Sequence, residues 1–101
     1  MKIKVIVKEP SVEPVAAEIE NELEEFQKIV GGNIEAVTLF EDFAVICNEE
    51  GRLKGLPWCC EILGINFIGN VIFVGVDGEQ FADLPITYKQ LKDCMPWLWA
   101  E

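Results

Sequence analysis

The side chains that most often carry out acid–base and nucleophilic catalysis are scarce in this sequence. Histidine, the commonest general base and imidazole ligand, is absent, and Ser11 is the only serine. Ser11 lies between Pro10 and Pro14, in a segment that predicts a turn, and it has no histidine to activate it. Hydrolysis by a serine triad is therefore excluded. We expect a protein with no catalytic residues and no cofactor.

Four cysteines are the remaining groups that could bind a metal or act as nucleophiles. Cys59 and Cys60 are adjacent, and this spacing does not clamp a tetrahedral zinc ion as a CxxC pair does. A reactive thiol usually needs a cationic neighbour, whereas the next residue is Glu61. Cys47 ends an apolar stretch and is expected in the core, and Cys94 is distant in sequence. We expect no metal site and no redox role.

Acidic pairs and glycine pairs also fail to match a known ligand site. Glu41-Asp42 and Glu49-Glu50 lie in predicted turns, where solvated acids are common, and no calcium-loop spacing surrounds them. Gly31-Gly32 follows a predicted helix, whereas a phosphate-binding loop precedes one. A small enzyme that uses a thiol or a carboxylate remains the least favoured interpretation, and it requires a pocket beside Cys59 or the Glu49-Glu50 turn.

The chain is strongly acidic, with 18 acidic against 8 basic residues and a net charge of −10 over 101 residues. Such a surface repels phosphate backbones and anionic headgroups, so we expect no direct nucleic-acid binding and no membrane association. No segment approaches the roughly 18 apolar residues of a membrane span. The segment 1–7 does not resemble a secretion signal. We expect a cytoplasmic protein with reduced thiols.

Seven glutamates occur between residues 9 and 25, with no lysine or arginine between Lys8 and Lys28. Such a run usually forms a solvated face. The alternative is an electrostatic mimic of a phosphate backbone that occupies the site of a nucleic-acid-binding enzyme. That alternative requires the acidic side chains to line one continuous face.

Alternating and helical spacings predict an α+β fold, with an antiparallel or mixed sheet built from hairpins and packed with two short helices. We expect a single domain over residues 1–101. Residues 2–8 alternate as a strand with one buried face. Residues 15–20 fit either a second strand or the start of one long helix. Asn21 stands three residues before Glu24, as in a capping box, so we predict a strand to residue 20 followed by a helix over 22–30.

The buried stripe of that helix is predicted from its helical spacing to contain Leu23, Phe26 and Val30. Residues 34–40 and 43–47 predict a hairpin joined by Glu41-Asp42. Gly51 is expected to supply a positive φ in the turn that follows.

In the last third of the chain, some segments have a clear secondary-structure pattern and others do not. Residues 58–63 have no clear assignment, because Pro57 could open a helical turn there. Residues 70–76 predict a central strand buried on both faces. Asp77-Gly78 predicts a turn, and Thr87 is a good cap for a last helix through Met95. Pro96 should end that helix and leave a short aromatic tail.

Three motifs together are distinctive: VGGNIE at 30–35, NEEGRLKGLP at 48–57 and IGNVIFVG at 68–75. This combination resembles the domain-of-unknown-function family numbered 3846, small proteins of bacteriophages, plasmids and bacterial genomes. The resemblance covers about residues 21–75. It implies a mobile-element context and a strand before the first helix. The family is uncharacterised, so the resemblance carries over no catalytic residue.

We therefore expect a non-catalytic accessory or protein-interaction module whose protein partner is unknown. The three tryptophans either cover the core or mark an interface hot spot. A homodimer is compatible with the sequence, through an unpaired strand edge or the tryptophan tail. The candidate interaction surface combines acidic, loop and tryptophan residues: Glu18, Glu20, Glu22, Glu24, Glu25, Lys54, Leu56, Pro57, Trp58, Trp97 and Trp99.

Overall fold

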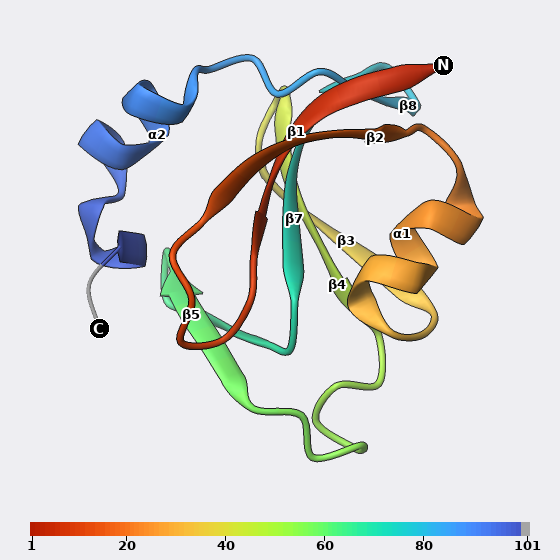
Figure 1. The fold of residues 1–101 in the computed structure, drawn as a ribbon, viewed down its shortest axis with the longest axis vertical. Helices are drawn as coiled ribbons and strands as arrows, with labels where there is room; N and C mark the ends of the chain where they lie inside the picture. The colour runs from red at the N-terminus through yellow and green to blue at the C-terminus, as the bar shows by residue number, and fades with distance from the viewer. Residues whose placement is uncertain (100–101) are drawn as a thin grey trace.

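A twisted antiparallel sheet of six strands forms the centre of the molecule in the computed structural model, which describes residues 1–99 (Figure 1). The fold is α+β, as the sequence predicts. The strands in spatial order are β2 (Val15–Glu20), β1 (Lys2–Lys8), β7 (Val71–Asp77), β4 (Phe43–Asn48) and β3 (Ile34–Phe40), with β8 (Gln80–Ala82) beside β7.

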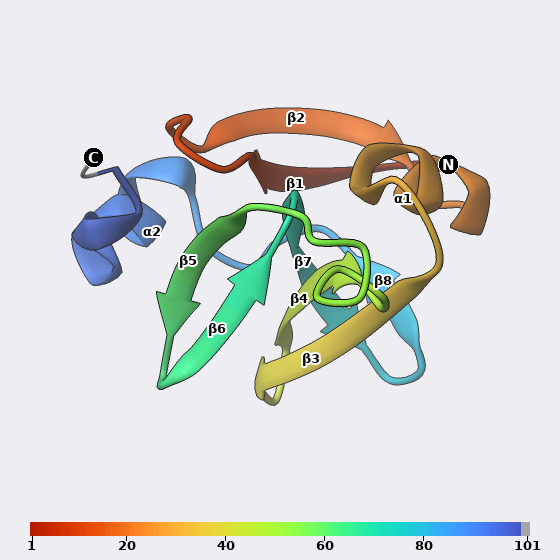
Figure 2. The same cartoon turned by 90° about the horizontal axis from the view of Figure 1, so that it is seen from below.

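The remaining elements cover the two faces of this sheet. One face carries the helix α1 (Leu23–Val30). The other face carries a separate hairpin of β5 (Trp58–Ile62) and β6 (Ile65–Ile68), together with the C-terminal elements α2 (Tyr88–Cys94) and η1 (Pro96–Trp99). Figure 2 shows the hairpin and α2 lying on the same side of the molecule, apart from α1.

The central strands β4 and β7 are buried on both faces, as the apolar run at 70–76 predicts. All six residues of β4 and the first five of β7 are buried. Val45 and Phe73 pack toward the hairpin, whereas Ile46 and Ile72 pack toward α1. These alternating contacts divide the core into two apolar clusters, one on each side of the sheet.

The β1–β2 hairpin forms as predicted, and it replaces the alternative of one long helix. Ile3 and Val5 are buried beneath α1. The prediction that β1 has only one buried face is wrong, because Ile6 and Lys8 are also buried on the opposite side. The C-terminal half of β1 is covered there by the segments that pack on the second face.

Helix α1 begins differently from the prediction. Its N-cap is Glu22, with no side-chain cap, and the Asn21 side chain instead donates a hydrogen bond of 2.8 Å to the carbonyl oxygen of Phe81. Asn21 therefore joins the hairpin to β8, and its predicted capping role is wrong. Leu23 is 52% exposed, so the buried stripe contains only Phe26 and Val30.

Residues 58–62 form the strand β5, not a helical turn, because its inward side chains fill the second apolar cluster. The prediction for Gly51 is also wrong: it has no positive φ, and a Cβ atom there would lie 3.2 Å from the carbonyl oxygen of Ile68. Gly55 takes the positive φ in this loop, at 67°.

The last helix confirms the capping prediction, since Thr87 and Gln90 form a complete capping box. The helix ends at Cys94, and Pro96 begins the short η1 turn. None of the helices within residues 1–99 has the length and apolar character needed to cross a membrane.

Gly75 provides a test of how the sheet accommodates the segment after β8. A Cβ atom at Gly75 would collide with the backbone carbonyl of Asp83, and this backbone is held by a 2.8 Å bond from the Leu84 amide to the Lys4 carbonyl. We expect Gly75→Ala to lower the free energy of unfolding by about 3 kcal/mol, as for an overpacked core. Urea denaturation measures this change.

Gly78→Ala is the matched control for this prediction. Gly78 has a φ of 65° and open space around it, so alanine there adds only backbone strain of about 1 kcal/mol. Equal losses of stability in the two variants would contradict the proposed collision.

Candidate functional site

Three segments that are distant in sequence meet at the tip of the β1–β2 hairpin: the turn at 9–14, the start of β5, and η1 (Figure 2). A cavity of about 110 Å³ lies between them. We call it the tryptophan cavity, because all three tryptophans of the chain contribute to its wall. Its lining residues are Lys8, Ser11, Val12, Glu13, Trp58, Cys59, Cys60, Trp97, Leu98 and Trp99.

Two of the tryptophans leave much of their ring surface exposed at the mouth of this cavity. Trp58 is 56% exposed and Trp97 is 50% exposed. The indole N–H of Trp58 donates to Asn66 Oδ1, and that of Trp97 donates to the Glu61 carbonyl, each at 2.8 Å. Because both N–H groups are already bonded, the exposed ring faces remain for apolar contacts.

Trp99 differs from Trp58 and Trp97, because its contacts fix the C-terminal segment in place. Its indole N–H donates to the Tyr88 hydroxyl at 2.9 Å, and that hydroxyl donates to the Pro14 carbonyl at 2.8 Å. The Trp99 and Tyr88 rings also pack edge to face with their centroids 5.3 Å apart. This chain of contacts holds the C-terminal segment against the tip of the hairpin.

A β-bulge turns two adjacent cysteines toward the same interior. The pairing of β5 with β6 shifts register between Trp58 and Cys60, so Cys59 has no partner in the ladder. Consecutive side chains of a regular strand point to opposite faces. The extra residue of a bulge breaks this alternation. Cys59 and Cys60 are consequently both buried, at 3% exposure each.

Lys8 provides the positive charge that the sequence around the two cysteines lacks. Its side chain is only 5% exposed, and its Nζ donates to the carbonyls of Glu9 and Val12 at 3.1 and 2.9 Å. None of the carboxylates within residues 1–99 forms an ion pair with it. The expectation that the cysteine pair has no cationic neighbour is therefore wrong, because Lys8 comes from β1 and reaches β5 through the fold.

The two adjacent thiols differ in acidity. The pKa of Cys59 is lowered, first by a hydrogen bond from Cys60 and further by the charge of Lys8, against the effect of burial. The pKa of Cys60 is raised by its hydrogen bond to Cys59 and by burial. Cys47 lies in the core as predicted, where burial and the nearby charge of Glu35 raise its pKa to about 11. Cys94 is exposed on α2.

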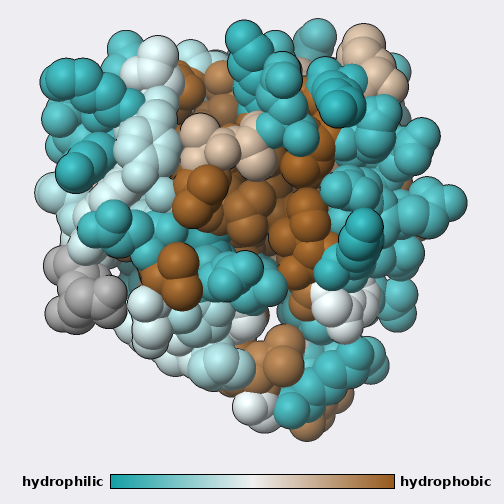
Figure 3. All heavy atoms as spheres, viewed as in Figure 1, coloured by the Kyte–Doolittle hydropathy of each residue, from teal (hydrophilic) through white to brown (hydrophobic). Residues whose placement is uncertain are grey.

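Apolar side chains continue from the cavity around the hairpin tip onto the opposite face. Figure 3 shows them gathered over β1 and β2, beside α1. Val12, in the turn before β2, and Val15, at the start of β2, are 45% and 57% exposed. A second hollow of about 280 Å³ is lined by Val7, Glu9, Val12, Glu13 and Val15. Since Val12 and Glu13 line both hollows, the two form one continuous surface.

The predicted acidic surface is divided between different parts of the molecule. On β2, Ile19 packs beneath α1, so Glu18 and Glu20 project from the other face of the sheet. Glu24 and Glu25 belong to the first turn of α1, and Glu22 is its N-cap. The two glutamates of β2 stand opposite two lysines of β1, in the register pairs Glu18–Lys4 and Glu20–Lys2. The run does not line one continuous face.

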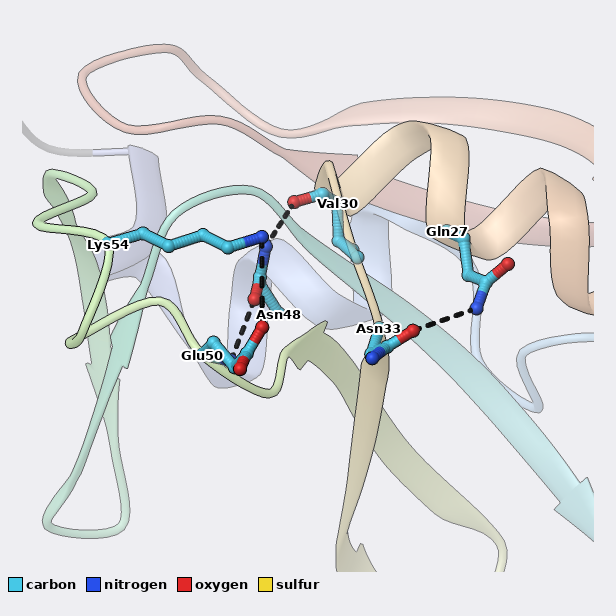
Figure 4. Close-up of polar contacts among 6 residues, drawn as sticks. All are labelled: Gln27, Val30, Asn33, Asn48, Glu50 and Lys54. Atoms are coloured by element: carbon cyan, nitrogen blue, oxygen red, sulfur yellow. Dashed lines mark hydrogen bonds and ion pairs between the residues drawn. The ribbon is translucent and has the colours of Figure 1, made fainter.

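Residues of the first two sequence motifs converge on the C-terminal end of α1 (Figure 4), and Asn70 of the third motif bonds to the same end of the helix. The last carbonyls of a helix have no partner within it. Asn48, which is 5% exposed, donates from Nδ2 to the Val30 carbonyl at 3.1 Å and accepts the Glu50 amide at 2.8 Å. Asn70 donates to the Ile29 carbonyl at 3.0 Å. Two asparagines thus cap the end of this helix.

The predicted loop residues support the same junction. The Lys54 ammonium lies 3.8 Å from a Glu50 carboxylate oxygen, and a Cβ atom at Gly32 would lie 3.0 Å from Lys54 Nζ. Leu56 packs so closely on Gly69 that a Cβ atom there would be 2.9 Å from Leu56 Cδ1. The Pro57 carbonyl accepts the Gly69 amide at 2.7 Å. Lys54, Leu56 and Pro57 therefore fix the loop before β5 and lie outside the cavity wall.

The family model described as "Domain of unknown function (DUF3846)" matches residues 1–94 of this chain. The chain belongs to the DUF3846 family. The match extends well beyond the residues 21–75 in which the resemblance is visible by eye, and it confirms that resemblance. No curated protein and no solved structure matches the chain.

The DUF3846 motifs in this chain are explained by the helix junction that they build, and this can be tested. We expect Asn48→Ala to lower the free energy of unfolding by about 2 kcal/mol, because the variant leaves the Val30 carbonyl without its partner in a buried setting. Thermal and urea denaturation provide the measurement.

Asn33→Ala is the matched control, because Asn33 is also an asparagine of the family motifs but does not cap α1. Asn33 is exposed, and its side chain only accepts a 3.3 Å bond from Gln27, so its replacement should change stability by about 0.5 kcal/mol or less. If Asn48→Ala is no more destabilising than Asn33→Ala, the capping role is incorrect.

Proposed function

We propose that this DUF3846 protein is a non-catalytic protein-interaction module whose partner binds across the tip of the β1–β2 hairpin. The observation that carries this proposal is the pair of half-exposed tryptophans, Trp58 and Trp97, that line one cavity. Tryptophan is enriched among interface residues that contribute most of the binding energy, especially beside pockets that accept a partner side chain.

The apolar surface around the tip supports the same proposal. Val12 and Val15 extend it from the tryptophan cavity to the second hollow at the hairpin tip. Large apolar side chains that are exposed singly need no explanation, but a contiguous group of them on one hairpin is typical of an interaction site. A cavity of about 110 Å³ has room for a small aliphatic side chain of a partner.

Charge indicates the chemical character of the partner. Glu9 and Glu13 are exposed at the tip, and the whole chain has a net charge of −10. We propose a partner segment with an apolar anchor residue flanked by lysine or arginine, since such a segment is attracted by this surface. The bacteriophage, plasmid or bacterial setting that the family resemblance implies, and a cytoplasmic location, belong to the same proposal.

The alternative of a phosphate-backbone mimic receives no support from the acidic run. Its glutamates lie on β2 and on α1, on different faces of the sheet, and two of them stand opposite lysines. A mimic would need a continuous row of uncompensated charge.

A photoreactive residue placed in the full chain tests the docking surface directly. We expect p-benzoylphenylalanine at position 58 or 97, introduced in cells of the native host, to crosslink to the same partner protein. The yield should fall as salt is raised, because the partner is attracted by charge. Mass spectrometry identifies the product.

The same probe at Leu53 provides the control, because this side chain is 88% exposed but lies on the loop away from the cavity. Equal crosslinking from position 53, or none from positions 58 and 97, would overturn the proposal. A crosslinked product with twice the mass of the chain would show that this surface binds a second copy of the chain and not a basic partner.

A further inference from the structure

We propose that Cys59 and Cys60 form a two-coordinate site for a soft monovalent metal ion, Cu(I), at the base of the tryptophan cavity. The proposal does not depend on the docking surface, because it rests on the buried floor of the cavity and not on its exposed rim. It concerns two thiols that the interaction proposal leaves without a role.

The backbone brings the two sulfur atoms to the same place. The bulge between Trp58 and Cys60 directs both adjacent side chains inward, and both line the same cavity. Both side chains also belong to the same buried apolar cluster. The Cys59 thiol donates to the Lys8 carbonyl at 3.7 Å. A metal ion bound to both sulfurs would replace this weak thiol hydrogen bond.

The number and type of donors favour Cu(I) over the commoner zinc ion. Thiolates are soft ligands that select Cu(I) and zinc among the biological metals. Structural zinc sites almost always take four ligands. Within residues 1–99, no group of three or more histidine, cysteine, aspartate or glutamate side chains is placed to hold a metal ion. Two thiolates alone satisfy only an ion that accepts two ligands.

The charge balance of the buried site fits the same ion. When Cu(I) binds, each thiol releases one proton to solvent and two sulfur–copper bonds form, which leaves a complex with a charge of minus one. Lys8 is buried beside the cysteines, and its ammonium is bonded only to neutral carbonyls among the described residues. A buried charge is costly unless it is paired. The complex and Lys8 would neutralise each other.

The cavity also gives the ion a route to the thiols. Ser11, Val12, Trp58 and Trp97 line it and are exposed, so the cavity reaches the surface, whereas Cys59 and Cys60 lie at its buried end. This opening gives a small ion access to the two thiols.

The test is an anaerobic titration of the fully reduced chain with Cu(I), in competition with the chromophoric chelator bicinchoninate. We expect one Cu(I) per chain and a sulfur-to-copper charge-transfer absorption in the near ultraviolet. Cys59→Ser and Cys60→Ser should each abolish this binding. Lys8→Met should weaken it about 10- to 100-fold, as removal of a supporting group near a metal usually does.

Two other cysteines provide matched controls, since Cys94→Ser changes an exposed thiol and Cys47→Ser a buried one outside the cavity. Both variants should bind Cu(I) like the wild type. In the wild-type chain, bound Cu(I) should also protect Cys59 and Cys60, but not Cys94, from alkylation, and this readout does not depend on whether a variant folds.

Three results would overturn the assignment: Cu(I) binding that persists in Cys59→Ser, alkylation of the cysteine pair that Cu(I) does not slow, or Zn(II) that displaces Cu(I) from the same thiols. These outcomes leave the crosslinking result at positions 58 and 97 unaffected, so failure of one proposal is distinguishable from failure of the other.

Discussion

β4 and the first five residues of β7 are buried on both faces, and the other elements are arranged to cover them. Val45, Ile46, Ile72 and Phe73 are fully buried, and they alternate between the two apolar clusters. A strand pair of this kind needs a cover on each side, because each uncovered side chain would lose the free energy of its burial. The chain provides α1 for one side, and the β5–β6 hairpin with the C-terminal segment for the other.

The two covers are built in different ways, and the candidate site lies in the one that is assembled from separate segments. The α1 cover is one continuous helix whose end is capped by Asn48 and Asn70. The family motifs lie at this junction and have a structural explanation there. The second cover is assembled from separate segments that meet at the hairpin tip. The join between them leaves the tryptophan cavity, with Lys8 and two thiols in its wall.

Local patterns in the sequence predict much of this fold. The alternation of residues 2–8 and the apolar run at 70–76 identify β1 and β7, and Thr87 identifies the start of α2. Patterns fail where a distant contact decides the outcome. Asn21 bonds to Phe81 instead of capping α1, because β8 brings a free carbonyl within reach. Residues 58–62 are a strand because their side chains fill a cluster that only the folded chain creates.

The sequence identifies the tryptophans of the candidate site, but it does not predict that two cysteines and Lys8 meet there. Aromatic residues near the end of the chain and after Pro57 are visible in the sequence, and the structure brings them to one cavity. The bulge that turns both cysteines inward has no local signal, because it depends on the register with β6. The approach of Lys8 to Cys59 spans 51 residues of sequence. Such a contact emerges only from the pairing of whole strands.

Native-state hydrogen exchange tests the central claim that the doubly buried pair organises the molecule. The amides of β4 and β7 should exchange only through global unfolding, with an opening free energy equal to the stability measured in urea. The amides of β5, β6 and η1 should open at a lower free energy, because these segments form a cover that can detach while the sheet persists. If β4 and β7 exchange as fast as the edge strand β2, or faster than the β5–β6 hairpin, the central pair does not hold the fold together.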